Sequence, residues 1–130
     1  MTSKIAFKDG TIFDTIAVYS SKEIIENAYR EKFEIRFPES VTLEQINTAA
    51  TAENLSEITL KEFDVNGEET GAYTYQNFTM VRGVGFAISD GGERYNVLVL
   101  AQLSALEIAQ QEQAAALAAL QKKIKGLLAE

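Results

Sequence analysis

Cysteine and histidine, the side chains most used for nucleophilic and acid–base chemistry, are both absent from this 130-residue chain. Their absence excludes thiol catalysis, imidazole acid–base pairs and zinc sites built from Cys and His. The 19 Asp and Glu side chains could still form an acid–base pair, which needs one carboxyl with a raised pKa in a cleft. No such pair stands out by its spacing. We therefore predict no catalytic residue, no metal, no cofactor and no enzymatic activity.

Two short motifs resemble ligand-binding loops but fit structural roles better. Residues 64–69 gather acidic side chains around Gly67, as a calcium loop does. An EF-hand loop has its glycine at the sixth position, whereas here the glycine is fourth, and Asn66-Gly67 is a strong signal for a β-hairpin turn. Gly83-Val84-Gly85 lacks the third glycine of a dinucleotide-binding fingerprint and lies in a strand-like run. We interpret the first motif as a turn and the second as a bulge or close crossing within a strand.

Two tyrosines beside this turn are the best candidates for a contact surface. Tyr73 and Tyr75 are separated by one residue, so a strand would place both rings on the same face. Aromatic side chains in a small sheet usually belong to the core. If this face is exposed, it becomes a patch for binding sugar or protein. The sequence leaves both interpretations open.

The overall charge bears on the class of partner. The chain has 12 Lys and Arg against 19 Asp and Glu, a net charge of −7. Binding to phosphate backbones needs a basic face, so we predict no nucleic-acid partner. The longest unbroken apolar run covers residues 114–120 and is mostly alanine, too short for a membrane span or a signal peptide. We therefore expect no membrane partner and synthesis in a cytoplasm.

The elements that carry these residues fall into two parts, because the composition changes near residue 100. All twelve Phe and Tyr residues lie in residues 1–100, which have 9 basic and 16 acidic side chains. Residues 101–130 have no aromatic side chain, are rich in Ala, Leu and Gln, and have three basic and three acidic side chains. We predict a β-rich head domain over residues 1–100 and a C-terminal helical oligomerisation stalk over residues 101–130.

The first part of the head has strand signals. Asp9-Gly10 is a turn signal between two β-rich runs, which predicts a hairpin over residues 3–19. Strict alternation of apolar and charged residues predicts a strand over residues 33–37 with one solvated face. Residues 20–31 fit either a helix, because Ser20 and Glu23 match a capping box, or a strand.

The second part of the head contains one helix signal. Thr42 and Gln45 match a capping box, which predicts a short helix over residues 43–50, followed by a loop over residues 50–56. Further strands are predicted at residues 58–63, 73–75, 78–88 and 95–100. The predicted fold class is α+β: a small, mostly antiparallel β domain with six or seven strands and one short helix, followed by a long C-terminal coiled-coil-like helix.

The stalk has an unbroken heptad series. Aliphatic residues take six of its eight core positions, which are Leu103, Leu106, Gln110, Gln113, Leu117, Leu120, Ile124 and Leu127. A helix over this series is roughly 37 Å long and would overhang a 100-residue head. We name these eight residues as the predicted oligomerisation site.

Three partners could cover the apolar stripe of this helix: its own sheet, further copies of the chain, or a different protein. Copies of the chain are favoured because Gln110 and Gln113 would lack partners against an apolar sheet, whereas around a symmetry axis they can bond to one another. The flanking positions are mainly the small Ala109, Ala114 and Ala116. Small residues there suit three or four helices better than two, so a trimer is the favoured homo-oligomer.

Four segments resemble a family of structural proteins from tailed phages and prophages of Gram-positive bacteria, of the tail or baseplate type. They are residues 4–11 (KIAFKDGT), 30–37 (REKFEIRF), 42–46 (TLEQI) and the start of the heptads at 100–103 (LAQL). The resemblance extends over nearly the whole chain and implies a β-rich head with a short helix and a C-terminal helical stalk. It also implies a place in the virion, in the tail or baseplate, beside other virion proteins.

From these observations we expect a non-enzymatic virion structural protein that is assembled in the host cytoplasm. It would oligomerise through its C-terminal helix and connect neighbouring subunits or fibres. Two alternatives from other classes stay open. One is a small acidic phage-encoded inhibitor or assembly chaperone that uses the −7 charge to occupy a basic partner. The other is a carbohydrate-binding head on a trimeric stalk, with Tyr73 and Tyr75 as the contact patch.

Overall fold

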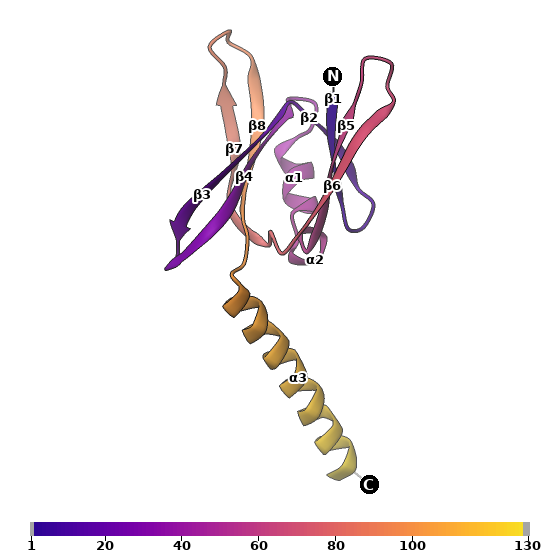
Figure 1. The fold of residues 1–130 in the computed structure, drawn as a ribbon, viewed down its shortest axis with the longest axis vertical. Helices are drawn as coiled ribbons and strands as arrows, with labels where there is room; N and C mark the ends of the chain where they lie inside the picture. Colours follow the sequence, from indigo (N-terminus) through magenta and orange to yellow (C-terminus); the bar gives the residue numbers. More distant parts are fainter. Residues whose placement is uncertain (1, 129–130) are drawn as a thin grey trace.

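The computed structural model describes residues 2–128 and shows an α+β protein. Eight strands form two four-stranded sheets in which every neighbouring pair is antiparallel. A C-terminal helix of 24 residues extends away from both sheets (Figure 1). The predicted α+β class and the mostly antiparallel arrangement are confirmed.

The first sheet has the strand order β2-β1-β5-β6. Its members are β1 (Thr2–Phe7), β2 (Ile12–Thr15), β5 (Glu57–Phe63) and β6 (Glu69–Gln76). The predicted turn at Asn66-Gly67 joins β5 to β6, and Gly67 has a φ of +81°. Asp64 accepts hydrogen bonds from the backbone N–H groups of Asn66 and Glu68, at 2.8 and 3.0 Å. Asp64, the first acidic residue of this cluster, therefore stabilises the turn itself.

The second sheet has the strand order β3-β4-β8-β7. Its members are β3 (Ala17–Ile25), β4 (Ala28–Pro38), β7 (Met80–Ile88) and β8 (Arg94–Ala101). Residues 20–31 form most of the β3–β4 hairpin, so a helix there is wrong. Their hydrophobicity does not explain the strands, since Ile24 is 76% exposed. They are extended because β3 and β4 pair with each other along the whole of β3. The turn between the two strands is at Glu26 and Asn27, where both φ angles are positive.

The predicted hairpin over residues 3–19 is wrong at its second half. Only Ile12–Thr15 pairs with β1, and from Ala17 onward the chain belongs to the other sheet. Between them, the backbone N–H of Ile16 donates to the carbonyl of Arg36 at 2.7 Å, which marks the crossing from one sheet to the other. This crossing divides one predicted strand into two and raises the count from six or seven strands to eight.

Two short helices stand where one was predicted. Helix α1 (Leu43–Ala49) begins with the predicted capping box, in which Thr42 and Gln45 each accept from the other's backbone N–H. Helix α2 (Ala52–Leu55) lies in the segment predicted as a loop. Thr51 caps it and Leu55 is fully buried, so packing stabilises a single turn that is too short to show a helical period.

The core lies between the two sheets. Its fully buried side chains include Ile5, Ile35, Phe37, Ile46, Leu55, Ile58, Phe78, Leu98 and Leu100. They come from both sheets and both short helices, and Phe78 comes from the connection before β7. Phe33, Ile35 and Phe37 of β4 face this core, as the alternation predicted.

Helix α3 (Ala105–Leu128) follows β8 after a connection of three residues. Figure 1 shows it pointing away from the head, with its C-terminal end far from both sheets. None of its residues is buried. Within residues 2–128, no helix is both long and apolar enough to cross a membrane.

Candidate functional site: the stalk helix and its junction with the head

The apolar stripe of α3 is open to solvent along its length. Its large aliphatic residues are between 47% and 71% exposed, namely Leu106, Leu117, Leu120, Ile124 and Leu127. Gln110 and Gln113 are exposed as well. The helix does not fold back on the sheets of its own head, so this stripe has no cover within the described chain. At 1.5 Å per residue the stripe lies on a helix about 36 Å long.

Leu103, the first residue of the predicted heptad series, differs from the other seven. It lies in the connection before α3, and its backbone N–H donates to the carbonyl of Asn77 at 2.9 Å. The preceding residue, Gln102, bonds to both sheets: its backbone N–H donates to Glu31 at 3.0 Å, and its side chain donates to the carbonyl of Gln76 at 3.0 Å. The connection is therefore held by the head before the helix begins.

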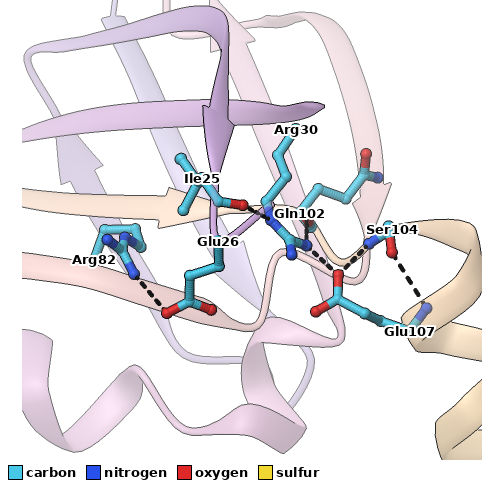
Figure 2. Close-up of polar contacts among 7 residues, drawn as sticks. All are labelled: Ile25, Glu26, Arg30, Arg82, Gln102, Ser104 and Glu107. Carbon is cyan, nitrogen blue, oxygen red and sulfur yellow. Dashed lines mark hydrogen bonds and ion pairs between the residues drawn. The ribbon is translucent and has the colours of Figure 1, made fainter. Parts of the chain in front are cut away.

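Arg30 is the centre of the junction between head and helix (Figure 2). It lies on β4 near the hairpin tip, and only 3% of its surface is exposed. Its Nε donates to the carbonyl of Ile25 at 2.8 Å, and its Nη1 donates to the carbonyl of Gln102 at 3.1 Å. The same Nη1 forms an ion pair with the carboxylate of Glu107 in the first turn of α3. One guanidinium thus links the hairpin, the connection and the helix.

Glu107 also caps the helix that it belongs to. Its carboxylate accepts from the backbone N–H of Ser104 at 2.9 Å, and its own backbone N–H donates to Ser104 Oγ at 3.2 Å. This reciprocal pair is a capping box, which satisfies N–H groups that the first helical turn leaves unpaired. The capping residue and the head-binding residue are therefore the same, and the start of α3 is formed where it is attached.

The charges at the junction stabilise one another. Hydrogen bonding to Arg30, and secondarily to Ser104, lowers the pKa of Glu107 from 4.5 to about 2. The bond to Glu107 raises the pKa of Arg30. Both groups are charged at neutral pH, so the ion pair is present under all physiological conditions. Such a pair, bonded to fixed backbone carbonyls, favours one geometry of attachment.

A second ion pair flanks the first on the solvent side. Glu26, in the turn of the β3–β4 hairpin, accepts from Arg82 of β7 at 3.2 Å (Figure 2). Arg82 is the extra residue of a β-bulge, because Val81 pairs with Leu100 and Gly83 pairs with Val99. The bulge predicted near Gly83 is thus observed one residue earlier. This pair is exposed and contributes little to stability.

The structure places Tyr73 and Tyr75 on one face of β6, as predicted, but in different surroundings. Tyr75 packs against Phe33 and Phe78 with ring centroids at 4.9 and 6.1 Å, both in edge-to-face geometry. Tyr73 is 52% exposed and its ring lies over Gly71, where a Cβ would come within 3.2 Å. One tyrosine supports the core and the other forms part of the surface.

Sequence reasoning found the apolar stripe but missed the junction. The signal that could have located one half of it is the sequence Ser104-Ala105-Leu106-Glu107, which matches a capping box. No local signal indicates Arg30, which lies 77 residues away from its carboxylate partner. Within residues 2–128, no three acidic side chains gather closely enough to hold a metal ion.

Fold and site together define a class of architecture: a two-sheet β head that carries an exposed amphipathic helix on a bonded junction. No protein family, curated protein or solved structure was found to match the chain. The support for a function therefore comes from the residues of the helix and the junction.

Proposed function

We propose that the protein is a non-enzymatic structural component of a phage or prophage virion, in the tail or baseplate. In this proposal three copies associate through α3 as a parallel coiled coil, and their heads connect neighbouring subunits or fibres. The observation that carries the proposal is the exposed apolar stripe of α3. The segments that resemble tail and baseplate proteins supply the biological setting.

The stripe supports self-association because it has no role within one chain. Five large aliphatic side chains of the heptad series remain in water on a single helix: Leu106 before the two glutamines, and Leu117, Leu120, Ile124 and Leu127 after them. Full burial of a large aliphatic side chain contributes about 1.5–3 kcal/mol, and roughly half of that is still to be gained by each of these half-exposed residues, so an uncovered stripe favours association. A coiled coil between copies covers all five, because each copy presents the same stripe at the same height.

The polar residues within the stripe support a symmetric partner of the same sequence. Gln110 and Gln113 stand at consecutive core positions of the heptads. At a symmetry axis each amide meets the same amide from another copy, and amides can donate and accept at once. The small Ala109, Ala114 and Ala116 beside the core allow close approach of three helices. These residues favour a trimer.

The junction supports a connecting role for the assembled protein. Arg30 and Glu107 bond the first turn of α3 to the head, and Gln102 bonds the connection to both sheets. A head attached in this way has a defined orientation on its stalk. A symmetric stalk with oriented heads presents three equivalent surfaces, which suits binding to a repeated platform.

The alternatives receive less support from the geometry. A carbohydrate platform needs free aromatic faces, and the ring of Tyr75 is already packed against Phe33 and Phe78. An acidic inhibitor or chaperone would use the charge of the head and has no need of an apolar stripe on α3. It predicts a monomer or dimer that is absent from purified particles.

The mass of the full chain in solution tests the proposal. We expect a mass three times the 14.3 kDa of one chain, measured by light scattering coupled to size-exclusion chromatography. The double variant Leu117→Lys/Leu120→Lys places charges in the stripe and should reduce the mass to that of one chain. The control Ala115→Lys/Ala119→Lys adds the same charges outside the core positions and should leave the trimer intact.

Two results would contradict parts of this proposal. A wild-type chain with the mass of a monomer would refute self-association and favour the acidic inhibitor or chaperone. Mass spectrometry of purified phage particles tests the virion role separately, since a virion component must be present in them. Absence from particles together with a trimeric mass would refute the virion role and retain the coiled coil.

A further inference from the structure

The head is a sandwich of two sheets, and two of its sides lie between an edge strand of one sheet and an edge strand of the other. The two sides differ in whether a helix covers them. One side lies between β2 and β7, and α1 covers it. Helix α1 contacts β7, its Ile46 is fully buried, and its Gln45 lines a cavity together with Phe13 of β2. The opposite side lies between β3 and β6, and the two cavities found there are lined by residues of β3, β4, β5 and β6, with none from α1 or α2. In the described residues, a helix therefore covers the side between β2 and β7 but not the side between β3 and β6.

A groove runs along this open side, and we call it the β3–β6 groove. It consists of two adjoining cavities of about 400 and 250 Å³ that share Ser20, Phe33 and Tyr75 in their linings. Its apolar wall also includes Val18 and Leu60. The volume is in the range of natural ligand sites. Its length follows the strands, which suits an extended ligand.

The edge of β6 beside this groove lacks the devices that protect the other three edges of the two sheets. Strand β2 has only four residues, β3 carries Lys22 in the lining of the groove, and β7 has a bulge at Arg82. Short strands, lysines and bulges are the means by which proteins prevent strand addition. After an irregularity at its start, β6 runs from Gly71 to Gln76 with regular pairing and without charge or proline.

The backbone of this segment is free to pair. In the described chain β6 pairs only with β5, so alternate N–H and C=O groups of residues 71–75 face outward. The carbonyl of Gln76 is already used by the side chain of Gln102. Five residues of strand span about 17 Å. A fifth strand at the free edge of β6 would lie directly beside Tyr73 and Tyr75, which line the groove.

We infer that the β3–β6 groove binds an extended polypeptide segment of a partner protein, which adds to β6 as a fifth strand of its sheet. Backbone hydrogen bonds to residues 71–75 hold the segment, and every second side chain packs in the groove against Phe33, Tyr73 and Tyr75. The groove lining carries Glu31 and Glu62 against Lys22, and residues 1–100 carry 16 acidic and 9 basic side chains, so the segment has a net positive charge. This inference is independent of α3 and holds for a monomer as for a trimer.

Selection from a random library of 12-residue peptides displayed on beads tests the inference with the full chain. We expect enriched peptides to have apolar residues at every second position and a net positive charge. The most enriched peptide, synthesised with a fluorophore, should shift the backbone amide signals of residues 71–75 in nitrogen-15 spectra. Its affinity is measured by fluorescence anisotropy.

Three variants decide where the peptide binds. Tyr73→Lys and Ser20→Lys place a lysine on the two opposite walls of the groove, and each should weaken binding at least about tenfold. Tyr29→Lys is the matched control, because Tyr29 is 71% exposed on β4 and lines neither cavity of the groove. It should bind as the wild type does. Amide signals outside the groove report whether each variant keeps its fold.

Several outcomes would overturn the inference. Enrichment of peptides without the alternating pattern would do so, as would shifts confined to residues outside β3 and β6. Failure to enrich any peptide with a Kd below about 1 mM would also refute it. Signals of residues 71–75 that shift with protein concentration alone would identify a second copy of this chain as the occupant, contrary to the partner that we infer.

Discussion

The head and α3 place their large apolar side chains in opposite environments. In the head, Phe37, Ile46 and Leu98 are fully buried between the sheets, whereas in α3 the equivalent side chains are about half exposed or more. A leucine of the head therefore stabilises the fold of one chain, and a leucine of α3 does not. The difference separates residues whose loss destabilises the fold of the head from residues whose loss leaves that fold intact.

The largest expected effect tests this separation directly. Phe37→Ala leaves a cavity in the core and should lower the free energy of unfolding of the head by about 3–5 kcal/mol. Leu117→Ala should leave the unfolding of the head unchanged, because no atom of the head covers that side chain. Urea unfolding followed by tyrosine fluorescence measures both, since the chain has no tryptophan. Equal losses from the two variants would refute the division.

A second prediction concerns the place where the two regions meet. Arg30→Met removes the donor that bonds Ile25, Gln102 and Glu107. Hydrogen exchange in the first turn of α3 should then accelerate by about tenfold or more, because two carbonyls and one carboxylate lose their partner. The control Arg82→Met breaks the exposed pair with Glu26 and should leave this exchange unchanged. An equal response to both variants would contradict a special role for the buried guanidinium.

The junction also has a defined dependence on pH. The pKa of Glu107 is about 2 in the folded chain and 4.5 ordinarily, because Arg30 and Ser104 stabilise its charged form. Its contribution is therefore complete above about pH 4.5 and decreases as the pH falls toward 2. A carbon-13 titration of the Glu107 carboxyl should show the low pKa. In Arg30→Met the pKa should rise toward its ordinary value, and an unchanged pKa would refute the assignment.

The smallest predicted effect concerns two glycines of the head. A Cβ at Gly85 would meet no atom within 4 Å, and its φ lies outside the positive region. Gly85→Ala should therefore stabilise the head by about 0.5–1 kcal/mol. Gly67 has a φ of +81°, so Gly67→Ala should destabilise it. Urea unfolding that gives both changes the same sign would contradict this prediction.

Local signals in the sequence were sufficient for several elements of the fold. The capping box at Thr42 and Gln45 and the turn at Asn66-Gly67 involve residues within a few positions of one another, and both are observed. Helix α3 and its apolar stripe were predicted for the same reason, because a helical period is visible in one continuous segment. Its association with other copies remains a prediction.

Non-local contacts explain what the sequence did not indicate. Ile24 and Tyr29 are exposed apolar residues of the β3–β4 hairpin, which is extended because its two strands pair with each other. The bond between Arg30 and Glu107 joins positions 77 residues apart. Neither feature has a periodic pattern, because both depend on how separate parts of the chain meet. The β3–β6 groove could not be predicted from the sequence either, because it depends on which side of the sandwich α1 covers.

The point at which α3 leaves the head has a mechanical consequence. The helix follows β8, which lies inside its sheet between β4 and β7 and is not an edge strand. A pull on the stalk therefore acts along β8 and loads its hydrogen bonds to both neighbours in shear, so that they must break together. The guanidinium of Arg30 ties β4 to the helix and gives the load a second path. We therefore expect the junction between the head and α3 to resist tension along the axis of the helix.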